Sequence, residues 1–378
     1  MRPWLGVEEQ QAAVAAIASG WVAQGPRVAA FEEAMAARLG AAHAVAVSSC
    51  TAGLHLALVV LGIGAADEVV VPSLSFIATA NAARYVGATP VFADVDEVTQ
   101  NLTPDTISAV LTERTKAVIL VHQAGMPADV HAVHALCDPL GIAVVEDAAC
   151  AIGATIDGAP VGSHSDLVTF SFHPRKLLTT GEGGMVLTTN AEWAQCLRRL
   201  REHGMNASAA ERHASGVPVV EQYLETGFNY RMTDVQAAIG LVQLDRLEAM
   251  IARRRTLADR YADRLQAIPG LGLPADPPYG TSNYQSYCVR LPEGSSIDRT
   301  ELMGALQRAG ISTRRGIMAA HLEPAYAGHP HAPLPVTERL TANSIILPLF
   351  HEMTEREHDR VVDALIAALV VTAEPGSR

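Results

Sequence analysis

The sequence predicts an α/β fold in which a mostly parallel central sheet is followed by a small α+β domain. Two observations indicate this fold. Short apolar, β-branched segments alternate with helical segments over the first two thirds of the chain, and several of these apolar segments contain hardly any polar residue. Alternation of this kind is typical of parallel sheets covered by helices, in which strands buried on both faces are continuously apolar.

The expected strands are short apolar runs, and the expected helices have apolar residues at helical spacing. The strands span residues 44–47, 68–71, 89–93, 117–121, 142–145, 167–171 and 185–188. The helices span residues 8–19, 27–39, 52–61, 76–86, 104–111, 128–136, 191–203 and 233–267.

A stretch rich in Pro and Gly, residues 269–280, follows the last of these helices and indicates a change of domain. We expect a large α/β domain over residues 1–245 and a small C-terminal α+β domain over residues 246–370. The long helix from about residue 233 leads into the small domain, and residues 371–378 form a flexible tail. The small domain is expected to contain strands at 286–291 and 344–347, helices at 299–309 and 354–369, and a loop rich in His and Pro at 321–335.

Composition excludes several classes of protein. The 378 residues carry a formal net charge of −12 and no long basic stripe, which disfavours a nucleic-acid partner. No apolar run is long enough to span a bilayer, and the N-terminus lacks the apolar core of a signal peptide. The five cysteines are widely spaced without a CxxC pair, which argues against a disulfide scaffold or a metal site. We therefore expect a cytoplasmic protein without a membrane partner.

Lysine is unusually scarce, because only Lys116 and Lys176 occur among 28 basic residues. Coding bias explains the scarcity, but arginine cannot replace a lysine that forms a Schiff base. Lys116 precedes an apolar strand, where a charge is usually solvated. Lys176 lies between a buried strand and the glycine-rich turn 181–184, where partial desolvation would lower its proton affinity. Lys176 is thus the candidate for covalent chemistry, with an ordinary surface loop as the alternative.

Two further segments lie at strand ends. Residues 48–53 form a small, hydroxyl-rich turn into a helix, where backbone amides and Thr51 suit a phosphate or simply cap the helix. Asp147 closes a buried strand and is either a helix cap or a buried acid that needs a cationic partner. A phosphate turn, an acid and an amine are together what pyridoxal 5'-phosphate (PLP) requires.

Further motifs occur along the whole chain. They are Gly20-Trp21, Gln24-Gly25-Pro26, Phe31-Glu32, the segment from Ser49 to Ala57, Pro72 to Asn81, Glu146 to Ala149, Ser171-Phe172, Gly181 to Gly184, His203-Gly204, Asn229 to Asp234 and Leu347-Pro348-Leu349. With these motifs, residues 21–369 resemble the DegT/DnrJ/EryC1/StrS family of PLP-dependent sugar aminotransferases. The resemblance implies the fold of aspartate aminotransferase, known as fold type I.

The resemblance also implies two catalytic roles. Lys176 is similar to the lysine that forms the internal aldimine with PLP and then moves protons between substrate and cofactor. Asp147 is similar to the acid that pairs with the pyridine nitrogen. Relatives that dehydrate rather than transaminate often have His in place of the lysine, so Lys176 favours transamination.

Other residues match cofactor contacts of the family. They are Cys50, Thr51, the backbone of Ala52 and Ser171 at the phosphate, Phe76 stacked on the ring, Cys150 where many members bind the cofactor's 3-hydroxyl through Gln or His, and Asn229, which reaches the phosphate of the neighbouring subunit. The match at Asn229 implies a homodimer with shared active sites. Cysteine is a poorer hydrogen-bond partner than Gln or His, which puts the role of Cys150 in doubt.

The substrate side is expected to involve Tyr230, Arg231, Glu182, Arg314 and His321. The arginines suit a diphosphate or a carboxylate, with surface ion pairs as the alternative. We expect the enzyme to move an amino group from L-glutamate, through pyridoxamine phosphate (PMP), to a keto group of a nucleotide-linked keto-deoxy sugar. The alternatives are a keto-cyclitol or another non-nucleotide ketone, a PLP-dependent dehydratase or aromatising enzyme, and a non-catalytic PLP-binding regulator.

Overall fold

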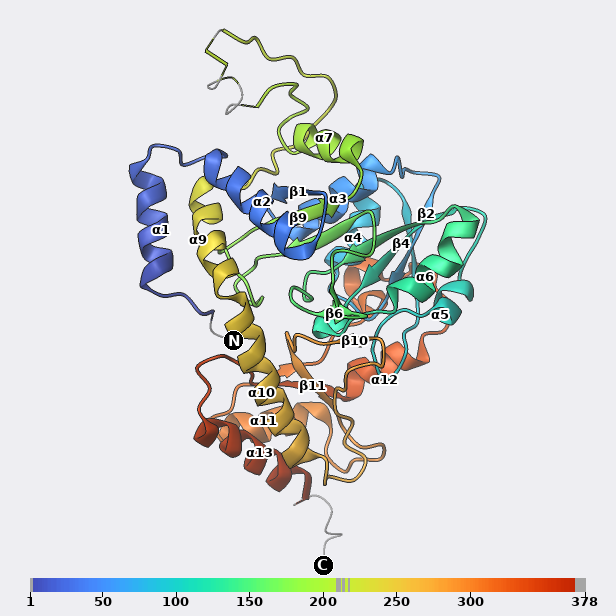
Figure 1. The fold of residues 1–378 in the computed structure, drawn as a ribbon. Helices are drawn as coiled ribbons and strands as arrows, with labels where there is room; N and C mark the ends of the chain where they lie inside the picture. The colour runs from blue at the N-terminus through green and yellow to red at the C-terminus, as the bar shows by residue number, and fades with distance from the viewer. Residues whose placement is uncertain (1–2, 209–211, 213–214, 217, 371–378) are drawn as a thin grey trace, which may run out of the picture.

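The computed structural model describes residues 3–208, 212, 215–216 and 218–370, and its α/β architecture agrees with the sequence prediction (Figure 1). The central sheet has seven strands in the order β1-β9-β8-β5-β4-β2-β3. Their bounds are β1 His43–Val47, β2 Glu68–Pro72, β3 Thr89–Ala93, β4 Thr115–Val121, β5 Ala143–Asp147, β8 Val168–Ser171 and β9 Gly184–Thr188. Only β9 runs antiparallel to its neighbours β8 and β1, so the predicted mostly parallel sheet is confirmed.

Helices cover both faces of this sheet. One face packs against α2 (Pro26–Leu39), α5 (Pro104–Ser108), α6 (Val130–Cys137) and α9 (Asp234–Asp245). The other face packs against α3 (Cys50–Val60), α4 (Ala78–Tyr85) and α7 (Ala191–Leu200). The N-terminal helix α1 (Val7–Ala18) lies against α9 (Figure 1).

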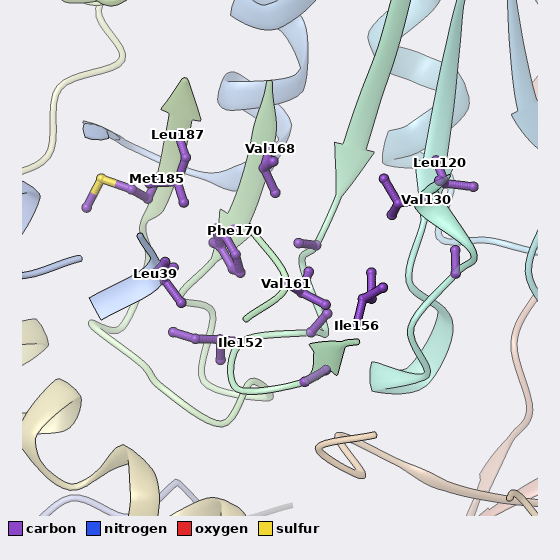
Figure 2. Packing of buried hydrophobic residues seen from close by; sticks show 14 of the residues in the cluster. Leu39, Leu120, Val130, Ile152, Ile156, Val161, Val168, Phe170, Met185 and Leu187 are labelled. Carbon is purple, nitrogen blue, oxygen red and sulfur yellow. The ribbon is translucent and has the colours of Figure 1, made fainter. Parts of the chain in front are cut away.

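Side chains of the strands alternate between two apolar cores, as the pleat of a strand requires. In β1, Val45 and Val47 enter the core under α3, whereas Ala44 and Ala46 enter the core under α2. The core under α2 continues past the strand ends to Ile152, Ile156 and Val161, beside Phe170 of β8 (Figure 2). Burial on both faces explains why these strands are continuously apolar in sequence.

The C-terminal part is built around a third apolar core. Its elements are α10 Leu247–Leu265, β11 Tyr287–Arg290, α11 Arg299–Arg308, β12 Arg314–Arg315, α12 Pro335–Asn343, β13 Ser344–Leu347 and α13 Glu355–Val370. The first turns of α10 still belong to the core of the large domain through Leu247 and Ile251, whereas Leu257 and Tyr261 belong to the third core. Helix α10 therefore packs into both cores with its two ends.

Several elements differ from the sequence prediction. The expected helix 233–267 is divided at Arg246, whose side chain forms ion pairs with Glu8 and Glu9 in the first turn of α1. Helix α12 follows directly on the expected loop 321–335 and was not predicted. A small sheet of β6 (Thr155–Ile156), β7 (Ala159–Pro160) and β10 (Gly280–Thr281) was also missed, because strands of two residues carry no periodicity. The expected tail, residues 371–378, lies outside the described residues.

Candidate active site

The predicted acid lies where neighbouring parallel strands end. Asp147 is the last residue of β5 and is paired in register with Val121 of β4 and Thr169 of β8. It is only 5% exposed. No helix begins behind it, since residues 149–153 form turns, so the alternative that Asp147 caps a helix is wrong.

The carboxylate of Asp147 is held by neutral donors. It accepts hydrogen bonds from the Thr79 hydroxyl (2.9 Å), from the Ala149 amide (3.2 Å) and from the Cys50 thiol (3.8 Å). Burial and the charge of Asp147 raise the pKa of Cys50 well above its usual value, so this thiol stays a donor. Thr79 is hydrogen-bonded in turn to the buried hydroxyl of Ser75 at 2.9 Å.

The two carboxylates that end β5 differ in their partners. Glu146 pairs with His122 at 2.8 Å, and although burial raises the pKa of Glu146, this partner lowers it below the usual value. Among the described residues, no Lys, Arg or His forms an ion pair with Asp147. A buried carboxylate is stable only beside a cationic or strongly donating group. Asp147 therefore fits the protonated ring nitrogen of PLP.

The predicted phosphate turn lies beside the end of β8. Ser49 caps α3 by accepting from the Ala52 amide at 3.1 Å, so Thr51 is not the cap. Within the described part of the chain, the Thr51 hydroxyl makes no hydrogen bond. Gly184 pairs in register with Ser171, and a β-carbon at Gly184 would lie 2.5 Å from the Ser49 carbonyl carbon. The close approach brings Ser171 to the N-terminus of α3, and these hydroxyls and first-turn amides fit a phosphate.

The amine of Lys176 lies 3.1 Å from the Cys150 sulfur, in the loop between β8 and β9. Burial alone lowers the pKa of Lys176, but its neighbours Cys150 and Asp147 raise it above the usual value. The expectation that the site lowers the proton affinity of Lys176 is therefore wrong for the chain itself. The neighbouring sulfur and carboxylate outweigh desolvation. Lys116, by contrast, is exposed on β4, and its amine lies 3.4 Å from the Glu113 carbonyl.

Two buried amides near Lys176 were missed by sequence reasoning. Gln285 contacts the peptides on both sides of Lys176, and Asn283 contacts the carbonyl of Cys150. Both come from the loop before β11, more than a hundred residues further along the chain. A Gln or Asn in a loop carries no sequence signal for such a contact.

The residues expected to stack on the ring and to reach the neighbouring subunit are both exposed. Phe76 is 64% exposed. Its carbonyl accepts a hydrogen bond from the backbone amide of Thr79 at 3.1 Å, and Thr79 is the residue whose hydroxyl contacts Asp147. Asn229 is exposed, and its backbone forms an isolated antiparallel β-bridge with Glu202. Next to it, Tyr230 is half-buried, and its hydroxyl lies 3.1 Å from Nδ1 of His55 in α3. Tyr230 is therefore tied to the helix that carries the phosphate turn.

Two of the expected substrate residues are engaged in ion pairs. Arg231 pairs with the buried Glu202 at 3.5 Å. Glu182 is exposed and lies 3.9 Å from His173, in the same loop as Lys176. Arg231 is thus held in an ion pair by a buried acid, whereas Glu182 remains exposed.

The other two expected substrate residues come from the C-terminal part. Arg314 of β12 is half-buried, and burial together with Arg175 lowers its pKa, whereas Cys150 raises it. His321 is buried, with Nδ1 2.6 Å from the Ser73 hydroxyl, and burial and His331 lower its pKa. His321 is therefore a buried residue, and its partner Ser73 lies two residues before Ser75 of the site.

None of the helices in the described part of the chain has the length and apolarity needed to cross a bilayer. Over the same residues, no group of three or more His, Cys, Asp or Glu side chains is arranged to hold a metal ion.

Comparison with known proteins connects this geometry to a family. The model of the DegT/DnrJ/EryC1/StrS aminotransferase family matches residues 3–366. Among solved structures, the aminotransferase TlmJ from Streptoalloteichus hindustanus is 37% identical, with 99% of each chain covered and a TM-score of 0.91. DesI, solved in the presence of its TDP-sugar product, is 35% identical, with 98% of this chain and 92% of that chain covered and a TM-score of 0.88. The putative sugar aminotransferase Spr1654 from Streptococcus pneumoniae, in its PMP form, is 28% identical, with 98% of each chain covered and a TM-score of 0.92.

These matches span almost the whole chain and share its α/β architecture with a mostly parallel sheet. The chain thus belongs to the DegT/DnrJ/EryC1/StrS aminotransferase family and is a PLP-dependent aminotransferase of fold type I.

Proposed function

We propose that this enzyme transfers the amino group of L-glutamate to a keto group of a nucleotide-linked keto-deoxy sugar, with Lys176 as the residue that binds the cofactor covalently. One observation carries the proposal: the amine of Lys176, the carboxylate of Asp147 and the N-terminus of α3 lie at one edge of the sheet. Among the described residues, this carboxylate has hydrogen-bond donors but no ion-pair partner. The likeness to DesI, solved with its TDP-sugar product, supports the sugar substrate.

When bound, PLP supplies an aldehyde for amino-group exchange and a protonated ring that stores electrons during proton transfer. The residues of the chain supply the environment for this chemistry. Asp147 keeps the ring nitrogen protonated, because its buried negative charge is stabilised by that proton. Thr79 and Ala149 orient the carboxylate through their hydrogen bonds.

Lys176 has two tasks in this proposal. Its amine would hold the cofactor covalently between turnovers. When free, it would carry a proton between the substrate carbon and the cofactor carbon that flank the shared nitrogen. Cys150 lies at 3.1 Å from the amine and holds it on the side of the loop that faces the end of β5. The raised pKa of Lys176 means that the amine must lose a proton on meeting the cofactor.

Phosphate binding is assigned to Thr51, Ser171 and the first amides of α3. A helix N-terminus attracts anions through its unpaired amides and its dipole. Cys50 and Ala52 belong to this first turn, but the Cys50 side chain is directed to Asp147, so its contribution to the phosphate is its backbone. Phe76 covers the open side of the ring.

The substrate is assigned to the side that Phe76 and Arg314 border. Arg314 and Arg231 are suited to the diphosphate or to the donor's carboxylates. His321, Tyr230 and Glu182 complete this border with hydrogen-bonding groups. A homodimer is part of the proposal, with Asn229 reaching the phosphate of the second copy.

Exposed apolar side chains near Asn229 support the dimer. Val220, Tyr223 and Leu224 are 83%, 63% and 59% exposed, on a segment that extends beyond α7 (Figure 1). Large apolar side chains left exposed on one segment favour a protein interface there. Sedimentation at several concentrations tests the dimer, and a purely monomeric holoenzyme would contradict it.

The decisive experiment pairs Lys176→Ala with the native enzyme. Borohydride reduction followed by digestion should leave the cofactor on the peptide that contains Lys176, and the variant should lose at least about a thousandfold in kcat. Lys116→Ala is the matched control and should retain full activity. Cofactor found on another residue, or transamination retained by Lys176→Ala, would overturn the assignment.

A substrate panel then separates the alternatives. Keto sugars linked to nucleotides, keto-cyclitols and simple ketones are each offered with glutamate, and the mass of the aminated product is measured. Amination of the nucleotide-linked sugars is expected. Amination of cyclitols alone, or loss of water without amination, would replace the sugar substrate with one of the alternatives. Conversion of bound cofactor to the PMP form by glutamate excludes a non-catalytic regulator.

A further inference from the structure

The loop before β11 contributes two fully or nearly fully buried amides to the surroundings of Lys176. Asn283 is 0% exposed and Gln285 is 4% exposed. Both belong to the C-terminal part of the chain, whereas the segments that they contact belong to the large domain. Buried amides are costly unless their donors and acceptors are bonded, so the partners of these two side chains indicate what they do.

Gln285 bonds the backbone on both sides of Lys176. Its Oε1 accepts from the Leu177 amide at 3.0 Å, and its Nε2 donates to the Arg175 carbonyl. One planar side chain therefore fixes the two peptide groups that flank the lysine. The orientation of the lysine's α-carbon, and with it the direction in which the amine leaves the loop, is set by this pair of bonds.

Asn283 performs the corresponding task at Cys150. Its Nδ2 donates to the carbonyls of Cys150 and Ile152, both at 2.8 Å. Its Oδ1 accepts from the backbone N–H of Gln285, also at 2.8 Å. Cys150 is the residue that contacts the Lys176 amine. The two amides thus connect both partners of that contact through one short loop.

A buried arginine holds this loop in place. Arg254 of α10 donates from Nε to the Tyr284 carbonyl at 2.7 Å and from Nη2 to the Gln285 carbonyl at 2.8 Å, and its Nη1 reaches the Leu349 carbonyl at 3.1 Å. Burial lowers its pKa to about 9. Within the described residues, no carboxylate forms an ion pair with Arg254, so its charge is stabilised by carbonyls alone. Tyr284 between the two amides has a φ of 48°, a left-handed conformation that needs such support.

We propose that Gln285 and Asn283, anchored by Arg254, are positioning residues that hold the Lys176 amine in its place relative to Cys150 and Asp147. The inference rests on the proposed function, because it assumes that Lys176 binds the cofactor. Lysine has a long, flexible side chain, and catalytic groups must be held within about 0.5 Å of their productive geometry. Fixing the backbone on both sides of the lysine reduces the freedom that its side chain would otherwise have.

The test variant is Gln285→Met, which keeps the length of the side chain and removes both bonds. The matched control is Gln243→Met, because Gln243 is a second buried glutamine, whose bonds go to Trp4, Glu9 and Thr179 and not to the peptides of Lys176. Both variants lose a buried amide, so both should unfold at a lower temperature. Only Gln285→Met should change the behaviour of Lys176.

Lysine reactivity gives a direct readout, because Lys116 and Lys176 are the only lysines in the chain. The full-length protein, stripped of cofactor, is labelled with an amine-specific acylating reagent, and the modification of Lys176 relative to Lys116 is measured by mass spectrometry. The ratio should rise severalfold in Gln285→Met and stay unchanged in Gln243→Met. In the holoenzyme, Gln285→Met should weaken PLP binding about tenfold and lower kcat more than it raises KM.

Two outcomes would overturn the proposal. One is a Gln285→Met variant that loses stability as the control does but keeps both the labelling ratio and PLP affinity within twofold. The other concerns a second variant, which is needed if Gln285→Met does not fold. Gln285→Glu keeps the acceptor for the Leu177 amide but loses the donor to the Arg175 carbonyl. Unchanged labelling of Lys176 and unchanged PLP affinity in this variant would contradict the positioning role. Failure of the proposed function is recognised separately, since the reduced native holoenzyme would then carry no cofactor on Lys176.

Discussion

Two regions of the candidate active site, here called its floor and its rim, differ in how much of their side chains is exposed and in how many bonds these make within one chain. The floor, formed by Asp147, Cys50, Thr79 and Ser75, is at most 8% exposed, and its polar groups bond one another. The rim, formed by Phe76, Glu182 and Asn229, is exposed, with Phe76 at 64%. The floor is therefore assembled by folding alone, whereas we infer that the rim gains its contacts from cofactor, substrate or a second copy. Substitutions in the two regions should have different signatures.

The largest effect is expected from Asp147→Asn in the floor. Asparagine has nearly the same shape but cannot stabilise a protonated ring nitrogen, so kcat should fall about 10²-fold or more. The fold should persist, because removing a buried charge is often neutral or stabilising. Steady-state kinetics and thermal melting measure both. A kcat within threefold of the native value would show that another group holds the ring.

Gly184→Ala should damage the floor through its packing. The new β-carbon would lie 2.5 Å from the Ser49 carbonyl carbon and 2.6 Å from the Cys50 amide nitrogen, so backbone must shift. We expect a loss of about 1–3 kcal/mol in the free energy of unfolding and weaker binding of PLP. Gly64→Ala, where a β-carbon meets nothing within 4 Å, is the control. Equal urea midpoints for the two variants would refute the close-approach argument.

Phe76→Leu tests the rim. Since the ring is exposed, its loss should leave the unfolding midpoint unchanged, but stacking on the cofactor contributes about 0.5–1.5 kcal/mol, or roughly two- to tenfold in PLP affinity. Tyr85→Leu replaces a 54% exposed aromatic at the end of α4, the helix that follows Phe76, and should leave affinity unaltered. If Phe76→Leu altered stability and not affinity, Phe76 would belong with the floor.

The smallest effect concerns acid sensitivity. Burial lowers the pKa of His321, so the unfolded chain takes up a proton near pH 6.5 that the folded chain resists. Stability from this group is complete above pH 6.5 and is lost as the pH falls through the lowered pKa. His321→Asn should therefore flatten the decline of the urea midpoint between pH 7 and pH 5. A decline as steep as in the native protein would assign it to other groups.

Three parts of the candidate site could be predicted from the sequence because they carry local signals. Asp147 ends an apolar strand, Lys176 is one of only two lysines, and the turn after residue 47 starts a helix. Strand ends of a parallel sheet meet at one edge, so the topology alone predicts that these residues lie close together. Thr79 was missed, because a threonine within a short helix has no signal for a contact with an acid 68 residues away.

The remaining surroundings could not be predicted, because they depend on contacts between distant parts of the chain. Gln285 and Arg254 act on the Lys176 loop from the C-terminal part, and nothing in their local sequence specifies that contact. The pKa of Lys176 was predicted in the wrong direction for the same reason: burial was foreseen, whereas the charges of its neighbours were not. The rim residues stay predictions, since their proposed partners lie beyond one chain.

The strand order has a consequence for how the protein is made. The first strand, β1, has β9 as its sole neighbour in the seven-stranded sheet, with Val47 opposite Gly184 and His43 opposite Thr188. A growing chain therefore carries β1 without its partner until residue 188 has left the ribosome, and unpaired apolar strands promote aggregation. The insertion of β9 between β8 and β1 then joins the Ser49 turn to the Lys176 loop. Synthesis would thus produce no partial binding site for a reactive aldehyde before this half of the protein is complete.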